Sequence, residues 1–118
     1  MELNYDSIFG KISVSPRLVA EISGAVAESC YGVVGMASRS TKDGIVSLLQ
    51  PDNRSRGVRV TIEDNMPVVE LHIIVEFGLN IKSICKSIAG RVRYTLESVT
   101  GVSVKCVNIR VEGIRVSE

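Results

Sequence analysis

The sequence predicts an α+β protein, a two-layer sandwich in which one mixed β-sheet carries two main helices on one face. Stretches with an apolar residue at every second position predict strands, and two longer stretches with apolar residues three and four apart predict helices. Hydrophobic residues make up 45% of the 118, enough for a buried core without disulfides. This length fits one domain, which we place at residues 10–116 after a short N-terminal extension at residues 1–9.

The first half of the domain predicts a strand, a helix and a second strand. Residues 12–14 alternate between apolar and polar. Ser15 is a capping residue, and Pro16 suits the first turn of a helix that we expect over residues 16–30. Residues 33–37 predict the second strand. The core-facing stripe expected on the helix is Leu18, Val19, Ile22, Ala25, Val26, Ser29 and Cys30.

Residues 38–57 carry weaker signals. Asp43 predicts the cap of a short helix that runs to Leu49 and ends before Pro51. The stretch PDNRSRG that follows is rich in turn-forming and basic residues and predicts a surface loop.

Two strands joined by a hairpin are predicted next. Residues 58–63 alternate, residues 64–67 form the connection, and residues 69–77 predict a long strand. Val69, Leu71, Ile73, Val75 and Phe77 are expected to face the core, and Glu70, His72 and Glu76 are expected on the opposite, solvated face.

The chain closes with a helix over residues 81–99 and a strand over residues 102–111. Gly101 is expected to end the helix. The alternation of the strand slips between Cys106 and Val107, which predicts a bulge or bend at that point. The core stripe expected on the helix is Ile81, Ile84, Cys85, Ile88, Val92, Leu96 and Val99.

Three motifs permit a chemical interpretation, and each has a structural alternative that we favour. His72 with Glu70 and Glu76 permits acid–base or metal chemistry, but fits a charged sheet face better. The GVVG stretch (residues 32–35) matches the G-x-x-G sequence motif of an RNA-clamping loop, but here it follows a helix and enters a strand. Gly78 and Asn80 permit an anion site, but fit a turn followed by a helix cap. We therefore predict no enzyme, no cofactor and no metal.

The cysteines, the N-terminus and the lengths of the apolar runs indicate the expected cellular location. Cys30, Cys85 and Cys106 are widely spaced, and they indicate reduced thiols in a cytoplasmic protein. The N-terminus has neither the basic nor the apolar region of a signal peptide. No apolar run approaches the roughly 20 residues that span a bilayer. Any membrane association is expected to use a partner or a surface.

Basic residues offer one possible binding surface. On the second helix three of them fall in a narrow sector, and three more lie in and after the turn-rich stretch. They could bind nucleic acid, although the net charge of +1 and the 4% aromatic content are low for that role. The residues are Lys82, Lys86, Arg93, Arg54, Arg56 and Arg59.

Small residues offer a second possible surface. They occupy the helix faces expected to point away from the core, where long polar side chains are more usual. We expect these faces to pack against each other or against a second chain. They comprise Ala20, Gly24 and Ala27 on the first helix, and Ser83, Ser87, Gly90 and Tyr94 on the second.

The order of motifs over about residues 10–114 resembles the alkaline-shock-protein (Gls-type, YloU-like) envelope stress response family. The stretches GKISVSPRLVAEISGAVAESCYGVVGM and VVELHIIVEFGLNIKSICKSIAGRVRYTLESVTGVSVKCVNIRVEGI carry this resemblance. It implies a cytoplasmic protein of Gram-positive-type bacteria without known catalysis. It also implies a link to envelope homeostasis, self-association, and in some members attachment to a small membrane-anchored partner. The family offers no catalytic residues to carry over.

We therefore expect a non-enzymatic interaction or scaffold protein that acts in the cell-envelope stress response by self-association and partner binding. The alternative is a small nucleic-acid-binding module that uses the basic residues. A third hypothesis places a metal or anion at His72, Glu70 and Glu76.

Overall fold

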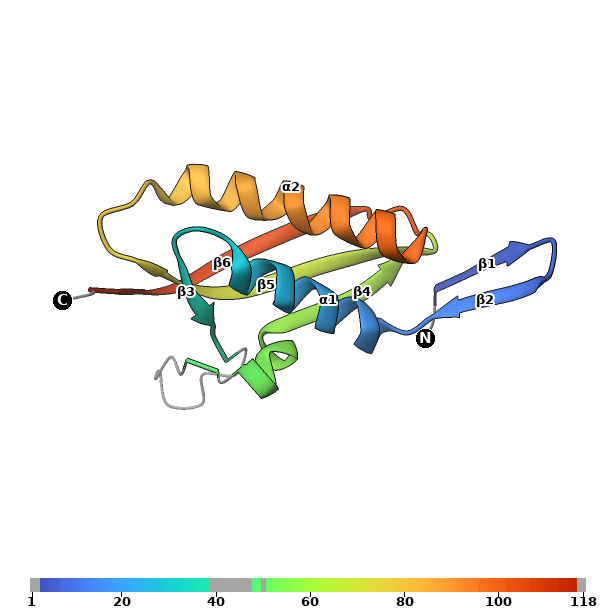
Figure 1. Ribbon diagram of the computed structural model, residues 1–118, viewed down its shortest axis with the longest axis horizontal. Coiled ribbons are helices and arrows are strands. Elements are labelled where there is room, and N and C mark those ends of the chain that lie inside the picture. The colour runs from blue at the N-terminus through green and yellow to red at the C-terminus, as the bar shows by residue number, and fades with distance from the viewer. Residues whose placement is uncertain (1–2, 39–47, 50, 117–118) are drawn as a thin grey trace.

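Two helices cover one face of a mixed β-sheet in the computed structural model, and a separate hairpin extends from one end (Figure 1). The structure describes residues 3–38, 48–49 and 51–116. The predicted α+β class is confirmed. The elements are β1 (Leu3–Ser7), β2 (Gly10–Val14), α1 (Pro16–Ser29), β3 (Val33–Met36), the 3₁₀ helix η1 (Pro51–Gly57), β4 (Val58–Glu63), β5 (Met66–Glu76), α2 (Ile81–Thr100) and β6 (Cys106–Arg115).

Strand β5 is the centre of the sheet. Along one side β6 runs parallel to it, from the pair Val68–Cys106 onward. Along the other side β4 pairs antiparallel with residues 66–71 of β5, and β3 pairs antiparallel with residues 73–75. Two short strands therefore share one edge of a long one, and the sheet is mixed as predicted.

The core lies between this sheet and the two helices. From β5 it receives Val69, Leu71, Ile73 and Val75, all fully buried. These residues alternate along the strand, so one face of β5 supplies the floor of the core. The helices contribute the residues above it, which include Val19, Ala27, Ile84, Ile88, Val92 and Leu96.

The predicted helix ends are confirmed by their hydrogen bonds. Ser15 caps α1, since its Oγ accepts from the Leu18 amide at 3.2 Å. Asn80 caps α2, since its Oδ1 accepts from the Ser83 amide at 3.0 Å. Gly101 ends α2 in the left-handed conformation with φ of 76°. The cap at Asn80 occupies a first-turn amide that an anion at this junction would need.

The β4–β5 hairpin is tighter than predicted. Asp64 and Asn65 both have positive φ, 54° and 59°, which is the geometry of a two-residue type I′ turn. Met66 and Pro67, which we expected in the connection, already pair with β4. Asn and Asp tolerate this left-handed conformation better than most residues, so the turn can be this short.

The last strand differs from the prediction at both ends. It runs over Cys106–Arg115 rather than residues 102–111, and Val102 and Val104 are buried in the irregular segment before it. The register shift lies opposite Ile73 and Ile74, which pair with Val111 and Gly113, and not between residues 106 and 107. The slip in the sequence pattern therefore marks the start of the strand rather than a bulge.

Several predicted core positions are exposed instead. Leu18, Ile81, Phe77 and Val99 all have substantial solvent exposure. Phe77 follows the last residue of β5, where the chain turns at Gly78 (φ of 93°) towards α2. Phe77 and Ile81 lie beyond the buried part of β5 and α2, whereas Leu18 and Val99 lie beside buried Val19 and Thr100 on the solvent side of their helices.

Two further segments also differ from the predictions. Residues 51–57, expected as a loop, form the 3₁₀ helix η1. Leu3–Ser7, part of the expected extension, forms β1 and pairs with β2 from Leu3–Val14 to Ser7–Gly10. The short helix expected after Asp43 lies largely outside the described residues.

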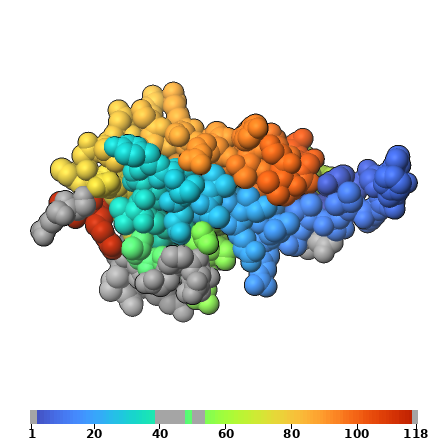
Figure 2. Space-filling model, viewed as in Figure 1, coloured from blue at the N-terminus to red at the C-terminus, as the bar shows by residue number. Residues whose placement is uncertain are grey.

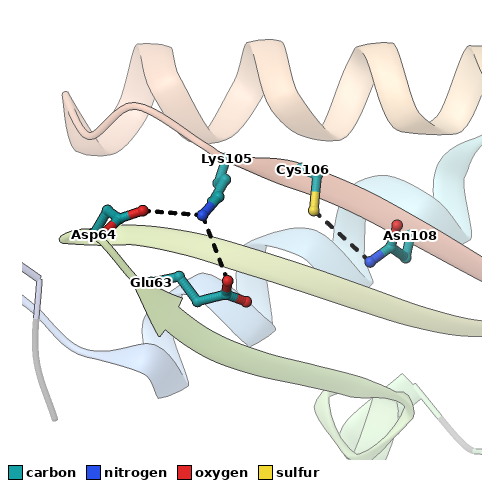
Figure 3. Close-up of polar contacts among 5 residues, drawn as sticks. All are labelled: Glu63, Asp64, Lys105, Cys106 and Asn108. Atoms are coloured by element: carbon teal, nitrogen blue, oxygen red, sulfur yellow. Dashed lines mark hydrogen bonds and ion pairs between the residues drawn. The ribbon is translucent and has the colours of Figure 1, made fainter.

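An ion-pair cluster ties the β4–β5 turn to the start of β6 (Figure 3). The Nζ of Lys105 lies 3.0 Å from Oδ2 of Asp64 and 3.5 Å from Oε1 of Glu63. The backbone amide of Lys105 donates to the Pro67 carbonyl at 2.9 Å. The hydrogen bond and charge of Asp64, assisted by Glu63, raise the pKa of Lys105 above its ordinary value.

We predict different costs for alanine at two glycines with positive φ. Gly78 has open space around its missing side chain, so Gly78→Ala should cost about 1–2 kcal/mol of backbone strain alone. A Cβ on Gly32 would lie 2.6 Å from Cδ1 of Ile84, so Gly32→Ala should cost about 1–3 kcal/mol more. Urea unfolding of both variants measures this, and equal losses would contradict the packing at Gly32.

We also predict a pH-dependent role for Lys105. Because its pKa is raised in the folded state, its stabilisation is complete at neutral pH and is lost as pH rises above about 10.4 through the raised value. Lys105→Met should lower the melting temperature slightly at neutral pH, and the difference should close in this alkaline range. Lys86→Met, on an exposed position of α2, is the control and should show no such closing gap.

Candidate interaction surfaces

The small-residue face of α1 lies inside the chain. Ala20, Gly24 and Ala27 are all buried, so the expectation that they face outward is wrong. A Cβ on Gly24 would lie 3.2 Å from Cγ and 3.3 Å from the carbonyl oxygen of Arg54 in η1. Helix α1 contacts η1, α2 and the sheet, and small residues permit this crowding. This face is not available to a second chain.

The small-residue face of α2 points to solvent. Ser83, Ser87, Gly90 and Tyr94 are all exposed, and no atom lies within 4 Å of a Cβ placed on Gly90. The two small-residue faces therefore do not pack against each other. Binding of a second chain by the α2 face stays a prediction.

The N-terminal half of this α2 face borders a groove. The groove has a volume of about 210 Å³ and a floor that includes Ile84. Leu79 and the largely exposed ring of Tyr31 form apolar walls. Gly32, next to Tyr31, lets α2 approach this closely because any side chain there would meet Ile84. We call the surface lined by Tyr31, Leu79, Asn80, Ser83, Ile84 and Ser87 the α2 groove.

The β1–β2 hairpin is the least expected feature of the surface. Figure 2 shows it as a narrow arm at one end of the molecule. At its tip Ile8 and Phe9 are each 93% exposed. The turn is held by Oγ of Ser7, which accepts from the Phe9 amide at 3.2 Å and donates to the Gly10 carbonyl at 3.1 Å. The apolar alternation of Leu3 and Tyr5 could have predicted β1, but the adjacent Ile8 and Phe9 interrupt it.

The root of the arm is fixed to the body. Leu3 and Val14, its first and last pair, are buried in the main core. The hydroxyl of Tyr5 donates to the carbonyl of Thr100 at the end of α2, at 2.9 Å. The side-chain amide of Asn65 donates to the Asn4 carbonyl at 3.0 Å. The arm is therefore anchored on α2 and on the β4–β5 turn, while its tip points away from both.

The basic residues divide among three places. Lys82, Lys86 and Arg93 are exposed on α2. Arg54 lies in η1, beside α1, and its guanidinium is 3.5 Å from Glu28; Arg56 is exposed in the same 3₁₀ helix. Arg59 pairs with Glu70 in the β4–β5 register and so lies on the sheet face opposite the helices. A single continuous basic surface is not formed, and nucleic-acid binding by these residues stays a prediction.

His72 lies in a charged cluster on the sheet face opposite the helices. It is only 7% exposed, so the expectation of a solvated position is wrong. Its Nε2 is 3.5 Å from Glu70, and its Nδ1 is 3.7 Å from Glu112, which also pairs with Arg110. Glu112 thus takes the place expected for Glu76. No group of three or more acidic, His or Cys side chains in the described part of the chain could hold a metal ion.

The three cysteines are free and lie on separate elements. Cys30 is buried at the end of α1, and Cys85 and Cys106 are half-buried. Burial raises the pKa of the Cys85 thiol. Cys106, at the start of β6, accepts a weak hydrogen bond from the Asn108 side-chain amide at 3.8 Å (Figure 3). None of the described helices is long and apolar enough to cross a bilayer.

Comparison with known proteins assigns the chain to a family. The model of the alkaline shock protein 23 family, described as having a cell envelope-related function, matches residues 4–116, which include nearly all of the hairpin arm. The chain belongs to this family. The resemblance seen in the sequence is therefore confirmed. No solved structure matches the chain.

The chain is also similar to several curated bacterial proteins. The chain is 36% identical to the uncharacterized protein YloU of Bacillus subtilis, over 99% of this chain and 98% of that protein. It is 37% identical to the uncharacterized protein Spy1614 of Streptococcus pyogenes, over 91% and 89% of the two chains. It is 28% identical to YqhY of Bacillus subtilis over 93% and 81%.

We predict opposite effects of lysine at the two helix glycines. Gly24→Lys should destabilise the protein by about 1–3 kcal/mol, because its side chain would collide with the backbone and side chain of Arg54. Gly90→Lys should raise stability by up to about 1 kcal/mol, because the position is open and lysine favours the helix more than glycine does. Chemical unfolding of monomeric protein compares them, and equal stabilities would refute the different packing of the two faces.

Proposed function

We propose that this chain is a non-enzymatic interaction or scaffold protein of the bacterial cell-envelope stress response, which acts by self-association and partner binding. The observation that carries the proposal is the hairpin arm, which holds Ile8 and Phe9 almost fully in solvent. Exposing two adjacent large apolar side chains gives the folded monomer no stability, whereas burying them against another molecule is favourable. The cell envelope-related function of the family supports the proposed setting.

The surroundings of the chain's reactive side chains favour binding over catalysis. His72, the single histidine, is enclosed by the sheet and by two carboxylates, which restricts the access of a substrate. Cys30 is buried, and burial keeps the Cys85 thiol in its protonated, weakly nucleophilic form. The exposed features are instead apolar side chains and a groove, which are the usual elements of an interface.

We further propose that the protein works in the cytoplasm and reaches the membrane through a small membrane-anchored protein partner. The support for this location is the function of the family together with the exposed apolar arm. The partner would contact a part of the surface that is not buried between copies of the chain.

The test combines solution and cellular measurements. Sedimentation velocity should show a mass that rises with concentration up to the high micromolar range. Crosslinking in cells, followed by identification of the linked proteins, should recover further copies of the chain and an envelope-associated partner. A clean monomer at high concentration that also recovers no partner would overturn the proposal. Retention of labelled DNA or RNA at low salt, lost steeply as salt rises, would favour the nucleic-acid alternative instead.

A further inference from the structure

The hairpin arm and the α2 groove lie at opposite ends of the molecule. The principal extent of the chain is 54 Å, with the arm at one end and the turn between β5 and α2 near the other (Figure 1). Each molecule therefore presents an apolar projection at one end and an apolar hollow at the other. Neither feature can reach the other within one molecule, because the root of the arm is fixed by its hydrogen bonds to Thr100 and Asn65.

The two features match in size and character. The groove measures about 210 Å³, and an apolar cavity of about 150 Å³ already holds benzene, so the groove has room for the ring of Phe9. Its apolar wall at Leu79 and its floor at Ile84 suit such a ring, and the small side chains of Ser83 and Ser87 leave the entrance open. This gives a physical reason for two residues of the small-residue face of α2, Ser83 and Ser87.

The charges of the arm and of the helix beside the groove differ. Lys82 and Lys86 adjoin the groove on α2 and are exposed. Asp6 is exposed beside the tip of the arm, where it pairs in register with Lys11. Residues 3–14 hold one Asp and one Lys, so the arm carries no net charge. An anionic lipid surface attracts segments with a basic excess, and the arm has none. The tip is therefore expected to bind a protein groove rather than a membrane.

We infer that the tip of the arm in one molecule docks in the α2 groove of a second copy, in a head-to-tail contact. This inference rests on the proposed self-association and names its surfaces. Because the two surfaces differ, each docked pair still has one free tip and one free groove, so the contact propagates into chains or closes into rings. Burying one phenylalanine removes about 150–250 Å² from water, far below the roughly 1,200–2,000 Å² of a stable interface. Each contact is therefore weak, and assembly depends on concentration.

Two variants test the inference by complementation. Phe9→Asp removes the tip and leaves the groove, whereas Ser87→Trp fills the groove and leaves the tip. Each should weaken self-association by about tenfold or more, as expected for a central anchor of an interface. Mixed together, the two should form heterodimers and nothing longer, because the mixture offers only one working tip and one working groove per pair. Sedimentation velocity of the separate and mixed proteins measures this.

The controls change similar exposed positions elsewhere. Val99→Asp replaces an exposed apolar residue at the other end of α2, and Ser98→Trp places an indole on the same helix. Both should associate as the unchanged protein does, and circular dichroism of all four variants confirms that they fold.

The outcomes separate the inference from the proposed function. If the unchanged protein associates and Phe9→Asp or Ser87→Trp associates equally well, the inference is wrong and the proposed self-association stands. A mixture that remains monomeric also overturns it. If the unchanged protein never associates, both fail. Co-sedimentation with phosphatidylglycerol vesicles that requires Phe9 but tolerates Ser87→Trp would assign the tip to lipid and overturn the docking.

Discussion

The hydrogen bonding of the central strand constrains the rest of this fold. Strand β5 has 11 residues, and β4 and β3, with 6 and 4, must together cover one of its sides. At the junction between them the carbonyl of His72 accepts from the amide of Ala37 at 2.8 Å, so the ladder continues across the gap. A buried strand with unpaired carbonyls would be costly, and this arrangement avoids that cost. Of the chain between β3 and β4, the described segment η1 packs beside α1.

The composition of α1 reflects its contact with η1. Helix α1 is enclosed by the sheet, by α2 and by η1, which returns the chain to β4. Three neighbours leave little space around the helix, so Ala20, Gly24 and Ala27 occupy buried positions that larger residues would overfill. Helix α2 has no such third neighbour among the described elements. Its outer face stays in solvent, and its small residues need another explanation.

Features set by residues close in the sequence were predictable, whereas features set by the packing of distant elements were not. The caps at Ser15 and Asn80, the stop at Gly101 and the buried alternation of β5 depend on neighbours within a few residues, and all are confirmed. The burial of the small-residue face of α1 depends on η1, which lies far along the chain, so periodicity alone placed that face in solvent. The partner of His72 was missed for the same reason, since Glu112 reaches it only through the parallel pairing of β5 with β6.

The two candidate surfaces, the groove and the arm, depend on their separation in space, which the sequence does not show. Helix α2 has 20 residues and spans about 30 Å. Its N-terminal turns line the groove through Ile84, and the carbonyl of Thr100 at its other end holds the root of the arm. An isolated two-stranded hairpin is only marginally stable, so the arm depends on this root to keep its shape. One rigid helix therefore fixes both surfaces and the separation between them. If tip and groove meet between molecules, α2 sets the repeat of the assembly, and a change at either end of the helix acts on the next copy as well as on its own.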